Sequence, residues 1–164
     1  MKTLLLLRHA KSSWKHAGLE DHDRPLNKRG RRDAPRIGRL IQQEGLMPDL
    51  IVSSTAERAR TTAAVVAETA GYDGDIRLTD DLYHAAPEAY LQILRTRPAT
   101  LGCVLVVGHN PSLEALLSEL TGVDEALPPA TLAHVTIMIE TWQELTFNGD
   151  AKLVNLWRPR ELPE

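Results

Sequence analysis

Three short runs of apolar residues, at positions 4–7, 50–52 and 103–107, predict the buried strands of a sheet. None of these runs contains a charged residue. Continuous apolar runs are typical of strands that are buried on both faces, as in a parallel sheet. The less apolar segment 76–78 is expected to form a short strand at the edge of the same sheet. The pattern therefore predicts a sheet that helices cover on both sides.

Between these runs, apolar residues recur at helical spacing. Three of the predicted helices are expected to end at Gly45, Gly71 and Gly122, because glycine readily adopts the left-handed conformation that ends a helix. Another helix is expected to begin at residues 86–88, where Pro87 suits the first turn. Side-chain caps are expected at the starts of two helices, at Ser54 or Thr55 and at Asn110-Pro111.

The first helical stretch contains Pro35, which conflicts with the pattern around it. A proline inside a helix loses one hydrogen bond and crowds the preceding turn. The helix is therefore either kinked at Pro35 or begins near Asp33, which would place the proline in its first turn. We predict a short turn before Asp33, followed by the main helix.

The remainder of the chain changes character. Residues 132–142 and 151–157 are rich in β-formers, and Asn148-Gly149 between them predicts a hairpin-like turn. Strands alternating with helices and followed by a hairpin predict an α/β fold: a three-layer sandwich with a mostly parallel central sheet and helices on both faces. The length of 164 residues suits one domain that spans residues 1–164.

Two segments lack periodicity. Residues 11–26 are interpreted as a loop that packs through Trp14 and Leu19, and the proline-rich residues 158–164 as a fraying tail.

Composition narrows the classes of partner. With 43% hydrophobic and 25% charged residues and a net charge of −3, the chain resembles an ordinary globular protein without a basic field for nucleic acid. Cys103 is the one cysteine, so no internal disulfide forms and a cytoplasmic location is expected. The N-terminal apolar run is too short for a membrane span and lacks a cleavage site, which argues against a signal peptide or a membrane partner. No metal-binding motif occurs, and a monomer without a cofactor is expected.

Basic residues and histidines follow the predicted strands. Arg8 and His9 follow the first strand, Arg58 lies in the first turn after the second, and His109 follows the third. The carboxyl ends of parallel strands meet at one sheet edge, where such folds bind their ligands. Guanidinium groups and helix N-termini both favour oxyanions. These four residues therefore predict a phosphate site, in which a neutral His9 nitrogen attacks phosphorus and His109 donates to the phosphoryl oxygens.

These motifs resemble the histidine phosphatase superfamily, which has a phosphoglycerate-mutase-like fold. The matching stretches are Leu7-Arg8-His9-Ala10, Arg24-Pro25-Leu26-x-x-x-Gly30, Ser54-x-x-x-Arg58-Ala59-x-x-Thr62 and Val107-Gly108-His109-Asn110-Pro111. The short chain and the Arg-His-Ala-Lys start are most similar to the SixA branch, whose members are phosphohistidine phosphatases. The resemblance implies that His9 accepts the phosphoryl group and that Arg8, Arg58 and His109 complete its pocket.

One departure from the superfamily pattern bears on the substrate. Many relatives carry a Glu or Asp proton donor where this chain has His84. An alkoxide leaving group needs such an acid, whereas the imidazole of a phosphohistidine can be protonated on its other nitrogen. The missing acid therefore favours an N–P bond. Asp81 and His84 stay as candidate proton donors.

The sequence supports three functional hypotheses. The leading hypothesis is a signalling phosphatase that acts on a phosphohistidine protein. The others are a small-molecule phosphomonoesterase and a non-catalytic phosphoprotein-binding module. Ser12, with Lys11 and Ser13, either binds phosphate or shapes the loop, and Ser54 is interpreted as a helix cap rather than a catalytic hydroxyl. The basic run 28–39 is either a solvated helix face or a docking surface for an acidic phosphoprotein.

Overall fold

A computed structural model describes residues 1–163 and contains one six-stranded sheet. The strand order is β3-β2-β4-β1-β5-β6. The strands are β1 (Lys2–Arg8), β2 (Leu50–Ser54), β3 (Ile76–Thr79), β4 (Cys103–Gly108), β5 (Leu132–Ile137) and β6 (Lys152–Trp157). The first four run parallel to one another, while β5 is antiparallel to β1 and β6 is antiparallel to β5. The predicted mostly parallel sheet is confirmed, with β3 at one edge.

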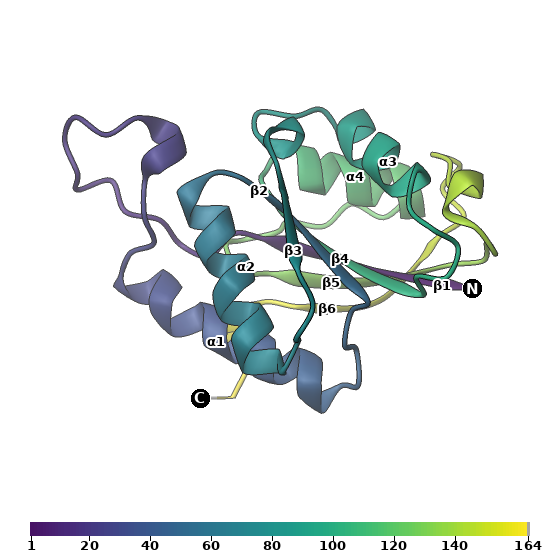
Figure 1. The fold of residues 1–164 in the computed structure, drawn as a ribbon, viewed down its shortest axis with the longest axis horizontal. Helices are drawn as coiled ribbons and strands as arrows, with labels where there is room; N and C mark the ends of the chain where they lie inside the picture. The colour runs from purple at the N-terminus through teal and green to yellow at the C-terminus, as the bar shows by residue number, and fades with distance from the viewer. Residues whose placement is uncertain (164) are drawn as a thin grey trace.

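Four α-helices cover the sheet: α1 (Lys28–Gln43), α2 (Glu57–Ala70), α3 (Pro87–Arg95) and α4 (Ser112–Thr121). Helices α1 and α2 lie on one face and α3 and α4 on the other, which gives the predicted three layers (Figure 1). Strand β1 shows why both faces are apolar. Leu4 and Leu6 belong to the core under α3 and α4, whereas Leu5 and Leu7 belong to the core under α1 and α2. Burial of each such leucine contributes about 1.5–3 kcal/mol to folding. None of the described helices is both long and apolar enough to cross a membrane.

Helix α1 begins earlier than predicted. It runs without a break from Lys28, with Pro35 in its interior, so the predicted start near Asp33 is wrong. Asn27 provides the cap, since its side chain accepts a hydrogen bond from the Gly30 backbone N–H at 2.9 Å. Ala34, Ile37 and Ile41 on the apolar face of the helix are fully buried, and this packing offsets the hydrogen bond that the proline cannot make.

The C-terminal strands pair as expected, and Asn148-Gly149 lies between them in a bend, where Gly149 is left-handed (φ 73°) and the Asp150 N–H donates to the Asn148 side chain at 3.0 Å. The predicted β-rich segment 132–142 is too long, because β5 ends at Ile137. The chain leaves the sheet after Ile137 and forms a 3₁₀ turn at Trp142–Glu144 before it returns in β6. Trp142 is fully buried, and its indole N–H donates to the Leu101 carbonyl at 2.8 Å. Trp142, which follows β5, therefore packs in the core beside the sheet and does not extend the strand.

The C-terminal segment is docked rather than frayed. Pro159 is buried, and the Arg36 guanidinium donates to the Leu162 carbonyl at 2.9 Å. The predicted fraying is therefore wrong for residues 158–163, and residue 164 lies outside the described residues.

The loop 11–26 is also held differently from the prediction. Its two ends pair with each other, since Ser12 forms a bridge with Leu26 and the Asn27 N–H donates to the Lys11 carbonyl at 3.0 Å. Trp14 and Leu19 do not anchor the loop, because they are 74% and 45% exposed. Polar contacts described below hold it instead.

Candidate active site

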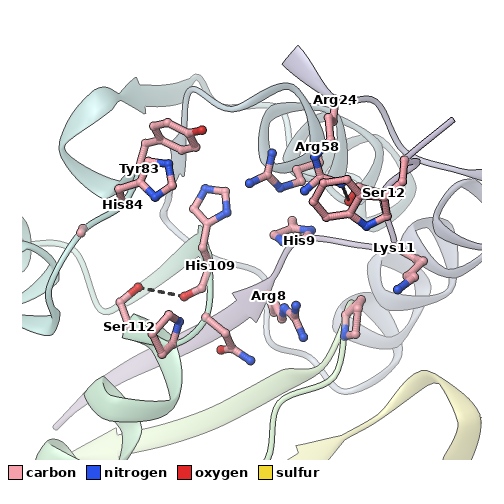
Figure 2. A pocket seen from close by; sticks show the side chains of 15 residues that line it. Arg8, His9, Lys11, Ser12, Arg24, Arg58, Tyr83, His84, His109 and Ser112 are labelled. Atoms are coloured by element: carbon pink, nitrogen blue, oxygen red, sulfur yellow. Dashed lines mark hydrogen bonds between the residues drawn. The ribbon is translucent and has the colours of Figure 1, made fainter. Parts of the chain in front are cut away.

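The sheet brings the ends of β1 and β4 side by side. Arg8 pairs in register with Gly108, so the residues that follow, His9 and His109, become neighbours. Their ring centroids are 5.1 Å apart (Figure 2). Arg58, the second residue of α2, points toward the same place from the next strand–helix junction. All four predicted residues line one cavity of about 440 Å³.

His9 is held in a single protonation state by its backbone. Its Nδ1 lies 2.8 Å from the Ala10 carbonyl, and because a carbonyl only accepts, Nδ1 carries the proton. Nε2 is therefore left with a free electron pair. Burial is the main cause that lowers the pKa of His9 to about 3, so the ring is neutral at neutral pH. The Ala10 N–H donates to the Thr62 hydroxyl of α2 at 3.0 Å, which fixes the chain beside the ring.

His109 is oriented by Ser54. Its Nε2 lies 2.8 Å from the Ser54 hydroxyl, which accepts a hydrogen bond from the Ala56 N–H at 3.2 Å. This contact fixes the orientation of the ring. Burial, followed by the Arg58 charge, lowers the pKa of His109 to about 4. A neutral ring with one N–H is a suitable donor to an oxyanion.

Neither predicted helix cap forms. The N-cap residue of α2 is Ala56, which has no capping side chain, and the Ser54 hydroxyl bonds the Ala56 N–H and the His109 ring rather than an N–H of the first helical turn. The Asn110 amide donates to the Glu114 carboxylate at 3.0 Å and to the Leu127 carbonyl at 2.9 Å, rather than capping α4. Ser54 and Asn110, which local sequence rules predict as helix caps, therefore form tertiary hydrogen bonds instead.

The two arginines each retain a free donor. Arg8 donates from Nη1 to the Leu127 carbonyl at 3.1 Å, and Arg58 donates from Nη1 and Nη2 to Asp21 at 2.7 and 3.0 Å. The Nε–H of each arginine is buried and has no hydrogen-bond partner among the described residues. Both arginines line the cavity, where their guanidinium groups favour an oxyanion. The donor set fits a phosphoryl group.

Asp21, which the sequence did not indicate, does not line the cavity but holds three residues that do. Its carboxylate accepts hydrogen bonds from the Tyr83 hydroxyl at 2.6 Å and from Arg24 at 3.0 Å, in addition to Arg58. The Tyr83 hydrogen bond and the two guanidinium groups hold the pKa of Asp21 well below its usual range. The carboxylate therefore stays charged and ties the loop 11–26 to the cavity. The one feature of the sequence that could have indicated Asp21 is its position three residues before Arg24, with which it pairs.

The other predicted residues fall into two groups. Ser12, Lys11 and His84 line the cavity, and the Ser12 hydroxyl accepts from Arg24 at 2.8 Å. Asp81 does not line it and lies instead in a separate hollow beside Arg77. Of the two candidate proton donors, the structure brings only His84 to the site (Figure 2).

The basic run 28–39 is partly occupied by ion pairs. Arg29, Arg32 and Arg36 lie 3.6, 3.4 and 3.1 Å from the carboxylate of Asp33, which is 2% exposed. No residue of this run lines the cavity. Gly30 lets α1 approach the site, because a Cβ there would collide with the Lys11 backbone. Within residues 1–163, no group of three His, Cys, Asp or Glu side chains is placed to hold a metal ion.

The two buried histidines predict a loss of stability in acid. Their folded-state pKa values of about 3 and about 4 lie below the ordinary 6.5, so the unfolded chain binds more protons from pH 6.5 down to about 4. The free energy of unfolding should fall between pH 7 and 5 by about 2 kcal/mol per histidine. Urea titrations of the protein and of His9→Gln measure this loss.

The loss should be smaller in His9→Gln and unchanged in the control His16→Gln, since His16 is exposed. The low pKa of Asp21 acts in a different window, because its contribution is lost only below about pH 4. Equal losses in the protein and in His9→Gln would contradict the neutral, buried state of His9.

Comparison with known proteins agrees with this geometry. The model of the histidine phosphatase superfamily (branch 1) matches residues 4–86. An uncharacterized chloroplastic protein of Arabidopsis thaliana is 32% identical over 170 residues, which cover 96% of this chain and 78% of that protein. A 2,3-bisphosphoglycerate-dependent phosphoglycerate mutase of Thermobifida fusca is 41% identical, but over only 43% of this chain and 30% of the mutase.

Solved structures extend the likeness to nearly the whole chain. The SixA protein of Agrobacterium tumefaciens superposes with a TM-score of 0.83 at 32% identity, over 96% of this chain and 98% of that one. A protein histidine phosphatase SixA complexed with tungstate has the same fold, with a TM-score of 0.83 at 18% identity over 98% and 99% of the two chains. On the family match, the relatives and the shared fold, this chain belongs to the histidine phosphatase superfamily, in the branch that contains the SixA proteins.

Proposed function

We propose that the protein is a phosphatase that hydrolyses phosphohistidine on another protein through a phosphohistidine intermediate on His9, with residues 1–164 acting as one catalytic domain. The observation that carries the proposal is the state of His9. Its Nδ1–H is committed to the Ala10 carbonyl, and its ring is neutral and buried beside two arginines. Such a ring presents a free nitrogen electron pair to an anion that the arginines hold in place.

In the first step, Arg8, Arg58 and His109 bind the phosphoryl oxygens, and His9 Nε2 attacks phosphorus. The new Nε2–P bond forms as the N–P bond of the substrate breaks, and the electron pair stays on the substrate nitrogen. A substrate imidazole that carries a proton on its other nitrogen leaves as a neutral ring. The Ala10 carbonyl stabilises the positive charge that develops on His9, because it already accepts from Nδ1. No metal is needed in this scheme, since two guanidinium groups supply the positive charge.

In the second step, water attacks phosphorus from the side that the imidazole left. The Nε2–P bond breaks, its electron pair returns to His9, and inorganic phosphate is released. The water gives up a proton, for which His84 at the rim of the cavity is the candidate acceptor. The ring centroids of His84 and Tyr83 are 4.0 Å apart, and this packing holds the His84 ring at the cavity. The backbone of His84 is left-handed (φ 52°).

Among residues 1–163, those that line the cavity include no carboxylic acid, which supports an N–P substrate over an ester. Asp81 lies in another hollow and Asp21 is bound to two arginines and a tyrosine. Neither is available to protonate an alkoxide. We assign this activity to the cytoplasm, to a monomer and to a signalling phosphoprotein as part of the same proposal, and the free Cys103 is consistent with a cytoplasmic location.

Turnover of two small substrates tests the proposal. We expect kcat/KM for phosphoramidate to exceed that for a sugar phosphate by about 100-fold or more, the contribution of the general acid that an ester would need. Phosphate release measured in parallel with both substrates, at matched pH, gives the ratio. A ratio near one, or a preference for the sugar phosphate, would instead support a small-molecule phosphomonoesterase.

A further inference from the structure

Trp14 is placed unlike the other tryptophans in the described part of the chain. It is 74% exposed, whereas Trp142 is fully buried and Trp157 is half-buried. It nevertheless lines the same cavity as His9 and Arg58. A large aromatic side chain exposed at the mouth of a polar cavity buries no core of its own, and exposed aromatic rings of this kind are typical of binding surfaces.

The ring is held in place from behind by a fixed cation. The Arg24 guanidinium carbon lies 3.5 Å from the centroid of the Trp14 ring. Arg24 is itself 9% exposed and donates to Asp21 and Ser12 at 3.0 and 2.8 Å, and to the Ser13 carbonyl at 3.3 Å. Because one face of the indole rests on a fixed guanidinium, the ring loses little further freedom when a ligand stacks on it.

The loop below the ring is fixed as well. Ser13, the residue before Trp14, donates from its backbone N–H to the Pro25 carbonyl at 2.8 Å, and Asp21 ties the far side of the loop to Arg58. The ring therefore stands at a set place relative to the phosphate-binding groups. In a ligand whose phosphoryl group is bound by Arg58, the same part of the ligand would therefore always contact the Trp14 ring.

We propose that Trp14 and Arg24 form a shelf that binds the peptide segment flanking the phosphohistidine of the substrate protein, an inference that rests on the proposed function. The phosphoryl group and its imidazole enter the cavity, and the neighbouring residues of the substrate lie across the indole. Lys11 lines the same cavity and adds positive charge to it. The shelf is thus suited to a segment that has an apolar or aromatic side chain for Trp14 and an acidic one for Lys11.

A comparison of peptide and small-molecule turnover tests the shelf. The substrates are a synthetic peptide that carries one phosphohistidine next to an aromatic and an acidic residue, and phosphoramidate, which has no flanking segment. We expect Trp14→Ala to lower kcat/KM for the peptide about tenfold more than for phosphoramidate, mostly through KM. Trp14→Tyr keeps an aromatic face and should recover most of the loss. Equal effects on both substrates, or no effect on either, would overturn the proposal.

Leu19→Ala is the matched control. Leu19 lies in the same loop and is 45% exposed, but it does not line the cavity, so the variant should behave as the parent toward both substrates. A thermal melt of each variant verifies that the fold is retained. A selective loss toward a nucleoside phosphate, with the peptide unaffected, would mean that the shelf binds a base and would also overturn the proposal.

A binding measurement separates this inference from the proposed function. A peptide with a non-hydrolysable phosphonate analogue of phosphohistidine should bind Trp14→Ala about tenfold more weakly than the parent, whereas inorganic phosphate should bind both alike. Titration calorimetry reads this directly and does not need turnover. If the parent turns over neither substrate but still shows this difference, the proposed reaction fails and the shelf stands. If turnover is as proposed and the difference is absent, the shelf fails alone.

Discussion

Replacement of His9 by alanine is expected to lower kcat/KM for phosphoramidate by about 10⁴-fold or more, because the variant has no nitrogen to accept the phosphoryl group. The reaction would then have to proceed by direct attack of water on a bound anion. His9 is 6% exposed, and its ring centroid lies 5.1 Å from that of His109. Steady-state release of phosphate measures the loss.

A labelling experiment completes this prediction. Brief mixing with ³²P-labelled substrate should place acid-labile phosphate on the parent protein, and peptide mapping should locate it at His9. His16→Ala, which removes an exposed histidine of the loop 11–26, should label and turn over normally. Full activity of His9→Ala, or a label on another residue, would exclude the proposed intermediate. A parent protein that binds phosphopeptide without labelling or turnover would instead be a binding module.

Arg58→Ala is expected to lower kcat/KM by about 10²–10³-fold, the usual loss when one preorganised donor to a reacting oxyanion is removed. The Arg58 side chain is buried and lines the cavity. Its loss removes both charge and hydrogen bonds from the transition state, so kcat should fall as well as kcat/KM. Activity with phosphoramidate, measured over a range of concentrations, separates the two constants.

Arg60→Ala is the matched control for this variant. Arg60 lies on the same helix, its side chain is 51% exposed, and it pairs with Glu57 at 2.7 Å away from the cavity. The kcat/KM of Arg58→Lys should lie between those of the parent and Arg58→Ala. An ammonium group keeps the positive charge, but unlike a planar guanidinium it cannot bond Asp21 and phosphate at the same time through several fixed N–H groups. Equal activity of Arg58→Ala and Arg60→Ala would show that Arg58 does not contact the phosphoryl group.

Sequence motifs predicted the position of Arg58 in the cavity but not the hydrogen-bond partner of Ser54. The sequence placed both at the end of the same strand and assigned one to a helix cap and the other to the phosphate site. In the structure Arg58 does line the cavity, but Ser54 bonds the ring of His109, a partner 55 residues away. A capping rule considers only neighbours along the chain, so it cannot predict a contact between residues that are 55 positions apart.

The sequence by itself determined the α/β architecture and the meeting of Arg8, His9, Arg58 and His109. Unbroken apolar runs fix which segments are central strands, and the residues that follow parallel strands must share an edge of the sheet.

Only the tertiary structure decided the contacts of Asp21, the exposed place of Trp14 and the separation of Asp81 from the cavity. The Asp21–Tyr83 hydrogen bond joins residues 62 positions apart, and an irregular loop carries no periodicity that would reveal such a bond. Side chains in a loop take their direction from the surfaces on which the loop folds back, and those surfaces exist only once the sheet and its helices have assembled.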